Sequence, residues 1–198
     1  MITLFPTLIE QKRLEFDNTN FVNRALELRD QLSSKNEWQC DTFTTMDSYN
    51  LVEDPLFMDL HITTMLKVLE FAGHYGDISG KNIQCTSSWI NVSSPGNFQE
   101  YHVHTNNHFS AVYYVKVPKN SGNIVFRAHD HAGDMFPLPF NLNTEKEPAY
   151  RTYFLEPKES DLIIFRSNLE HMVQKNNSND NRISIALNFV LQENTNGK

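Results

Sequence analysis

A chain of 198 residues with 39% hydrophobic and 12% aromatic content is long enough for one well-buried domain and short for two, so we expect a single domain over 1–198. The formal net charge of −7 argues against broad binding to nucleic acids or anionic membranes. Two cysteines imply no disulfide framework, and neither a secretory leader nor a membrane-spanning apolar run is recognisable, so we expect a soluble, cytoplasmic protein.

The first 80 residues or so have the periodicity of supporting helices. Residues 1–16 are expected to form a short strand or an extended arm. Apolar residues recur at helical spacing after several candidate N-caps, which predicts a helix over about 20–33. A second helix is predicted to begin near Asp54 and Pro55, with proline in its first turn, and to end at 73–76. We expect both helices to pack on the outside of a sheet.

From residue 81 onward the pattern changes to short strands separated by turns rich in Gly, Pro and Asn. The predicted strands span about 84–92, 98–105, 109–118, 123–127, 149–156, 161–166, 171–175 and 181–191. Mostly antiparallel strands at this spacing predict a mainly β (α+β) fold, a cupin-like jelly roll or double-stranded β-helix with its core at about 84–191. The long loop 128–148 is expected to be a lid over the barrel mouth or a disordered segment.

The predicted strand from Arg182 to Phe189 has two chemically different faces. Its odd-numbered residues are apolar and should pack in the core, whereas Arg182, Ser184 and Asn188 share the other face with an alanine. This second face could lie in water. In a barrel of this size it could also line a ligand-filled interior.

Three histidines suggest a metal site. His102 and His104 are one residue apart in a predicted strand, so their imidazoles should project from the same face. His171 follows the apolar run 162–165, in a strand that a barrel could bring close to them. Imidazoles are common metal ligands, and the set predicts a mononuclear site with an anion-binding arginine beside it. Each histidine could also be an ordinary, partly exposed side chain.

The order of these residues resembles the 2-oxoglutarate- and Fe(II)-dependent oxygenases, whose motif is His-x-Asp/Glu, then a distal His, then Arg-x-Ser. Here the motif is matched by His102-Val103-His104, His171 and Arg182-Ile183-Ser184. More narrowly, Trp89-x-Asn91 and the run 110–115 resemble an oxygenase family of phages and marine bacteria. The resemblance covers about residues 84–190.

The resemblance implies that His102, His104 and His171 hold Fe(II) in an enzyme that hydroxylates a substrate. The sequence departs from the family motif at His104, which stands where the motif has its carboxylate ligand. Glu100, on the same face of an ideal strand as His102, is a weaker candidate for a carboxylate ligand. The segment His129-Asp130-His131 reads as a polar surface loop.

The resemblance also implies a co-substrate site for 2-oxoglutarate. Arg182 and Ser184 would hold the distal carboxylate, because a guanidinium backed by a hydroxyl suits that group. Asn91 would contact the co-substrate, and Tyr113 would supply the hydroxyl that the family motif places two residues after Asn91, where this chain has Ser93.

Two other functions remain open from the sequence. One is a cupin-type dioxygenase that uses three histidines and no 2-oxoglutarate. The other is a non-enzymatic jelly-roll module that binds a carbohydrate or a peptide. The spacing of Arg182 and Ser184 behind His171 favours the 2-oxoglutarate enzyme. The acidic charge balance favours a small molecule or peptide over a nucleic acid as its substrate. Neither the substrate nor the oligomeric state follows from the sequence.

Overall fold

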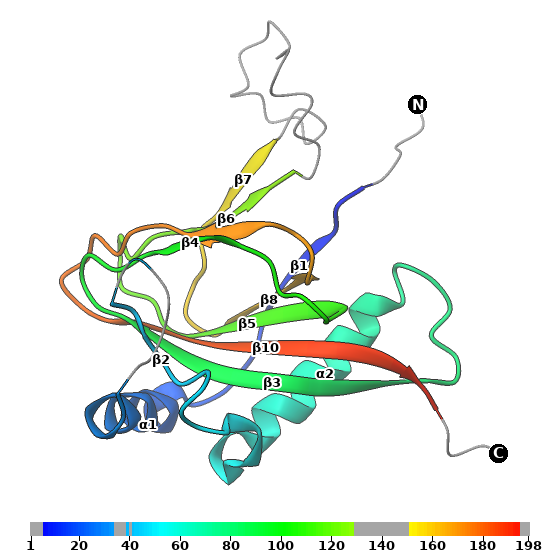
Figure 1. The fold of residues 1–198 in the computed structure, drawn as a ribbon, viewed down its shortest axis with the longest axis horizontal. Coiled ribbons are helices and arrows are strands. Elements are labelled where there is room, and N and C mark those ends of the chain that lie inside the picture. Colours follow the sequence, from blue (N-terminus) through cyan, green and yellow to red (C-terminus); the bar gives the residue numbers. More distant parts are fainter. Residues whose placement is uncertain (1–5, 34–38, 40, 129–150, 195–198) are drawn as a thin grey trace, which may run out of the picture.

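The computed structural model describes residues 6–33, 39, 41–128 and 151–194 as two antiparallel sheets with two helices on one outer face (Figure 1). The elements are β1 (Ile9–Arg13), α1 (Asn18–Gln31), β2 (Phe43–Thr44), η1 (Leu51–Glu53), η2 (Pro55–Phe57), α2 (Met58–Ala72), β3 (Lys81–Ser93), β4 (Gln99–His102), β5 (Phe109–Lys116), β6 (Ile124–Arg127), β7 (Thr152–Leu155), β8 (Asp161–Arg166), β9 (His171–Val173) and β10 (Arg182–Glu193). The large sheet has the order β1-β8-β5-β10-β3-β2, and the small sheet has the order β4-β9-β6-β7.

The predicted fold class is confirmed. Eight strands, β3 to β10, lie where the turn signals place them, and the two antiparallel sheets form the expected jelly roll. Several boundaries differ from prediction by two or three residues, and two differences change the reading of an element. The second helix opens with the 3-10 turn η2 before α2 begins, and β4 ends at His102 instead of continuing through His104. Most of the predicted lid, 129–148, lies outside the described residues.

The helices cover the outer face of the large sheet (Figure 1). That face carries the apolar side of β10, whose residues Ile183, Ile185, Leu187 and Phe189 are buried in one core with residues of both helices. The helical contributors to this core include Phe21, Ala25, Leu28, Leu60, Val68 and Phe71. None of the helices in the described ranges is long and apolar enough to cross a membrane.

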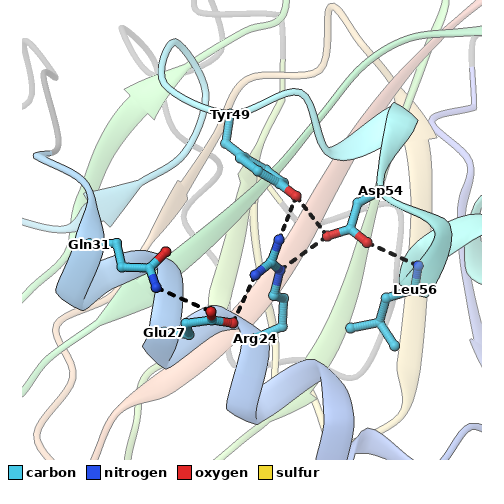
Figure 2. Close-up of polar contacts among 6 residues, drawn as sticks. All are labelled: Arg24, Glu27, Gln31, Tyr49, Asp54 and Leu56. Atoms are coloured by element: carbon cyan, nitrogen blue, oxygen red, sulfur yellow. Dashed lines mark hydrogen bonds and ion pairs between the residues drawn. The ribbon is translucent and has the colours of Figure 1, made fainter.

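A buried carboxylate ties α1 to the turns that precede α2 (Figure 2). The Oδ2 atom of Asp54 accepts hydrogen bonds from Nε of Arg24 at 3.2 Å and from the hydroxyl of Tyr49 at 2.9 Å. Its Oδ1 accepts from the backbone N–H of Leu56 at 3.0 Å, which caps η2. Burial by itself raises the pKa of Asp54, but these hydrogen bonds outweigh it and hold the pKa below the ordinary value. The charged carboxylate therefore stabilises this junction.

We expect Asp54→Asn to lower the free energy of unfolding at neutral pH by about 1.5–3 kcal/mol, the range for hydrogen bonds to a charged group. A carboxyl whose folded pKa is depressed stabilises the protein above its unfolded pKa, and this contribution is lost as pH falls through the folded pKa. The difference between wild type and Asp54→Asn in urea unfolding should thus shrink below about pH 4. Glu27→Gln, which removes an exposed partner of Arg24, serves as the control and should have a much smaller effect.

The turn between β5 and β6 requires glycine at position 122. Gly122 has a φ of +92°, and a Cβ there would lie 2.5 Å from the carbonyl oxygen of Gln174. We expect Gly122→Ala to cost at least about 2 kcal/mol of stability in chemical denaturation. Gly76→Ala is the matched control, because its Cβ would meet nothing within 4 Å in the described chain, and it should change stability by less than about 1 kcal/mol.

Candidate metal centre

The structure brings together the three histidines that were predicted as metal ligands. His102 on β4 lies directly opposite His171 on β9 in the register of the small sheet. His104 follows β4, and its backbone N–H donates to the carbonyl of Ser167 at 2.9 Å. The ring centroid of His104 lies 5.2 Å from the centroid of His102 and 5.2 Å from that of His171. The centroids of His102 and His171 are 4.2 Å apart. One potential ligand atom from each ring lies within 4.8 Å of the others.

A β-bulge decides which side chains of β4 face this cluster. Gln99 pairs with Val173 and His102 with His171, so β4 has one residue more than β9 between these pairs. Gln99 and His102 consequently both line the interior. Glu100 does not join the histidine cluster, and its Oε1 accepts a hydrogen bond from the backbone N–H of Gln39 at 2.7 Å. The expectation that Glu100 shares the ligand face was wrong, because it assumed strict alternation.

Backbone carbonyls orient two of the three rings. Nδ1 of His102 lies 2.7 Å from the carbonyl oxygen of Glu100, and Nδ1 of His171 lies 2.9 Å from that of Leu169. A carbonyl can only accept, so both rings carry their proton on Nδ1. The lone pair on Nε2 of each ring is thereby left available for a metal ion.

The electrostatic environment keeps all three rings neutral. Burial lowers the pKa of His102, lowers that of His104 to about 4, and holds that of His171 well below its ordinary value. Mutual repulsion of the would-be imidazolium charges adds to burial at His104 and His171. Because only a neutral imidazole binds a metal, no proton has to be removed near neutral pH.

His104 is supported by side chains rather than by a carbonyl. The rings of Trp89 and His104 have centroids 5.6 Å apart, and Nδ2 of Asn188 lies 3.5 Å from Nδ1 of His104. The Asn188 amide is itself held, because its Oδ1 accepts from Oγ of Ser110 at 2.8 Å and its Nδ2 donates to Oγ of Ser87 at 3.2 Å. Asn188 was recognised from sequence only as part of the polar face of β10, with no role at the site.

A cavity between the two sheets reaches the histidines. Its walls come from both sheets and from the loop after β2, and the lining residues are Met46, Trp89, Asn91, Gln99, His102, His104, Val112, Tyr114, Ile124, His171, Val173, Arg182, Ser184 and Ala186. None of these described lining residues is acidic, although the chain as a whole has a net charge of −7. The polar face of β10 therefore lines an interior and not a solvent-exposed surface.

Arg182 places a guanidinium in this cavity at the start of β10. The residue is only 3% exposed. Its Nη1 donates to the carbonyl of Ser121 at 2.9 Å, and its Nη2 donates to Oγ of Ser93 at 3.0 Å. The turn at Ser121 and the end of β3 thus fix the guanidinium in place.

Three polar side chains lie in a row across the sheet next to Arg182. Ser184 on β10 is directly opposite Asn91 on β3 and Tyr114 on β5, so all three point to the same face. Oδ1 of Asn91 is buried with no hydrogen-bond partner among the residues that the structure describes. Burial raises the pKa of Tyr114 to about 12, against the opposing influence of Arg182, so its hydroxyl remains a donor.

The structure corrects the prediction for Tyr113. Neighbouring residues of a strand point to opposite faces, and Tyr113 points toward the helices, where its hydroxyl donates to Oδ1 of Asn18 at 2.8 Å. Tyr114 lines the cavity instead. The candidates His129 and His131 lie outside the described residues.

The donor set fits a divalent first-row metal ion. Imidazole nitrogen suits iron, zinc, copper and nickel, and the histidine cluster supplies three such donors to the cavity. Three protein ligands would leave further coordination positions open toward the cavity. Arg182 and the hydroxyls of Ser184 and Tyr114 present hydrogen-bond donors to the cavity, whereas the unpaired Oδ1 of Asn91 is an acceptor.

Comparison with known proteins agrees with this chemistry. The profile of a family described as "Putative 2OG-Fe(II) oxygenase" matches residues 87–188, which include the three histidines, Arg182 and Ser184. No curated protein matches the chain.

Solved structures share the fold at low sequence identity. SnoK, a non-heme alpha ketoglutarate dependent carbocyclase from nogalamycin biosynthesis, has a TM-score of 0.64 at 14% identity, covering 92% of this chain and 79% of SnoK. A Pseudomonas putida prolyl-4-hydroxylase has a TM-score of 0.61 at 14% identity, covering 93% of this chain and 92% of the hydroxylase. The viral collagen prolyl hydroxylase of Paramecium Bursaria Chlorella virus-1 has a TM-score of 0.57 at 14% identity, with coverages of 91% and 94%.

We expect His171→Ala to weaken Fe(II) binding at least about 100-fold, since it removes one of three donors. His104→Asp should retain binding, because a carboxylate is also a good iron ligand at that place, whereas His104→Leu should not. Anaerobic calorimetric titration with Fe(II) measures these affinities. His74→Ala, at an exposed histidine outside the cluster, is the control and should bind like wild type. Equal affinity in wild type and His171→Ala would contradict the site.

Proposed function

Because the chain belongs to the 2OG-Fe(II) oxygenase family, we propose that it hydroxylates a small molecule or a peptide with Fe(II) held by His102, His104 and His171. Enzymes of this family use Fe(II) and 2-oxoglutarate. The observation that carries the proposal is that a cluster of three neutral imidazoles, one buried and two half-buried, opens on the same cavity as Arg182, and none of the described lining residues is acidic. We further propose that residues 1–198 act as one domain, since both helices pack against the large sheet that carries the site.

The three imidazoles would hold the metal without neutralising it. The family motif has a carboxylate where this chain has His104, so an all-histidine set leaves one more unit of positive charge on the ion. Fe(II), when bound, supplies activation of dioxygen coupled to oxidation of the co-substrate. The fixed Nδ1–H tautomers of His102 and His171 aim their Nε2 atoms, and Asn188 with Trp89 limits the orientations open to His104.

Arg182 would bind the distal carboxylate of 2-oxoglutarate. A guanidinium forms charge-assisted hydrogen bonds with a carboxylate, and this one is already immobilised by Ser121 and Ser93, so little side-chain entropy is lost on binding. The hydroxyls of Ser184 and Tyr114 lie on the same face and can donate to the same anion. We assign to Tyr114 the role that the sequence suggested for Tyr113. Asn91, which lines the same cavity, would donate to the co-substrate from its Nδ2.

A three-histidine set would by itself also suit a dioxygenase that uses no 2-oxoglutarate. Such an enzyme would have no need of the buried Arg182 or of the row of donors beside it. A non-enzymatic binding module would in turn have no need of the neutral imidazole cluster. The combination of both features in one cavity favours the 2-oxoglutarate-dependent hydroxylase.

We expect Arg182→Ala to weaken 2-oxoglutarate binding about 30-fold or more while leaving Fe(II) affinity nearly unchanged. The reason is that the guanidinium would contact the distal carboxylate and not the metal. The measurement is anaerobic titration of the Fe(II)-loaded protein with 2-oxoglutarate, followed by the visible charge-transfer absorption of the chelate. Arg166→Ala is the matched control, because Arg166 lies at the end of β8 outside this cavity.

Two results would count against the proposal. Chelate absorption that titrates identically in wild type and Arg182→Ala would remove the arginine from the co-substrate site. Fe(II) binding by wild type without any chelate absorption would favour the dioxygenase that uses no 2-oxoglutarate.

A further inference from the structure

A second cavity lies on the helix-covered side of the large sheet, where α2 ends, and is called here the α2-end pocket. It has a volume of about 310 Å³, at the lower end of the range for small-molecule sites, and it opens to solvent. Its walls come from the end of α2 and the turn that follows, and from the adjoining ends of β3, β5, β8 and β10. It shares no described lining residue with the cavity that contains the histidines, so the two are separate.

Arg166 presents an oriented guanidinium to the α2-end pocket. Its Nε donates to the carbonyl of His108 at 3.0 Å. Its Cζ lies 5.3 Å from the ring centroid of Tyr75 and 5.5 Å from that of Phe109, which is directly opposite Arg166 in the pairing of β5 with β8. These contacts fix the side chain but use only one of its five N–H groups. Within the described chain the Nη1 and Nη2 atoms make no hydrogen bond or ion pair, so four N–H groups are left for a ligand.

The charges of this pocket leave one cation without a counter-ion. Its described lining contains Lys81, Arg166 and one acidic residue, Asp77. Lys81 pairs with Glu193, and Oδ1 of Asp77 accepts from the backbone N–H of Ser79 at 2.8 Å. Hydrogen bonds from Ser79 lower the pKa of Asp77, so this carboxylate is already charged and occupied. A single negative charge on a ligand would therefore match Arg166.

A second donor and an apolar wall define the rest of the ligand. Nδ1 of His108 accepts from the backbone N–H of Leu191 at 2.9 Å, so the neutral ring carries its proton on Nε2, where it can donate. The apolar lining residues are Ala72, Ile78, Phe109 and Leu191. Donors for one anionic group beside an apolar wall suit a molecule with a charged head and an apolar body.

We propose that the α2-end pocket binds a small organic carboxylate. The carboxylate accepts paired hydrogen bonds from Nη1 and Nη2 of Arg166, and an aromatic or branched body packs against the apolar wall. A carboxylate fits better than a phosphate monoester, because its single charge equals that of the one unpaired cation, whereas a phosphate carries nearly two. The pocket is on the face of the sheet opposite the histidines, and this proposal does not depend on the enzymatic activity.

The first experiment titrates the isotope-labelled full chain with benzoate and follows the backbone amide shifts by NMR. We expect shifts concentrated at residues 75–78, 108–109 and 191, with a dissociation constant below about 1 mM. Benzamide has the same shape without the charge, and acetate has the charge without the ring. Each should bind about tenfold more weakly than benzoate or worse, because each lacks one of the two features that the pocket offers.

Substitutions locate the anion. Arg166→Ala should weaken benzoate binding about tenfold or more, and Arg166→Lys about threefold or more, because an ammonium keeps the charge but lacks the paired N–H groups. Arg13→Ala is the matched control, since Arg13 is an exposed arginine that lies opposite Asp161 at the other end of β8. Arg182→Ala should also bind benzoate like wild type, which separates this pocket from the co-substrate site. Circular dichroism checks that each variant is folded.

Several results would overturn the proposal. One is the absence of amide shifts around the pocket at about 10 mM benzoate. A second is binding of benzamide or acetate as tight as that of benzoate. A third is an unchanged affinity in a folded Arg166→Ala protein. Shifts confined to the surroundings of Arg182 would place benzoate in the cavity with the histidines and would equally count against the α2-end pocket.

Discussion

The register of β10 between β3 and β5 is the constraint on which both the fold and the site depend. Its alternation sends Ile185 and Leu187 into the core under the helices and sends Arg182, Ser184 and Asn188 toward the cavity. A slip of one residue would exchange the two faces of β10, burying an arginine among apolar side chains and removing from the cavity wall the polar groups that β10 contributes. Core packing against α1 and α2 therefore also positions the functional residues.

Much of this arrangement was predictable because it follows from local periodicity. The strand positions and the two faces of β10 follow from alternation and turn chemistry, whereas the convergence of His102 and His171 was expected from the barrel fold and the family resemblance. Two errors have a common origin in non-local structure. Strand β5 is buried on both faces, so periodicity could not show which of Tyr113 and Tyr114 faces the cavity. The bulge that turns Glu100 aside exists only in the pairing of β4 with β9, which a single strand sequence does not reveal.

The cavity has an unusual charge balance for an acidic protein. Its described lining combines three neutral imidazoles and one arginine with hydroxyls and amides, and none of these described residues is acidic. A dianionic co-substrate and a divalent cation would bring equal and opposite charges into this space. Because His104 stands where the family motif has a carboxylate, Arg182 would be the charged side chain that the protein contributes. The occupied site would then be net positive by about one charge.

The hydrogen bonds that orient His102 and His171 both go to backbone carbonyls, and this affects which substitutions nearby the site tolerates. Each ring donates to the carbonyl of the residue two positions earlier in its own strand segment, Glu100 and Leu169. Every amino acid carries that carbonyl, so substitution at either position leaves the acceptor in place. The orientation of these two candidate ligands therefore does not depend on which side chains stand at positions 100 and 169, whereas the orientation of His104 depends on the side chains of Asn188 and Trp89.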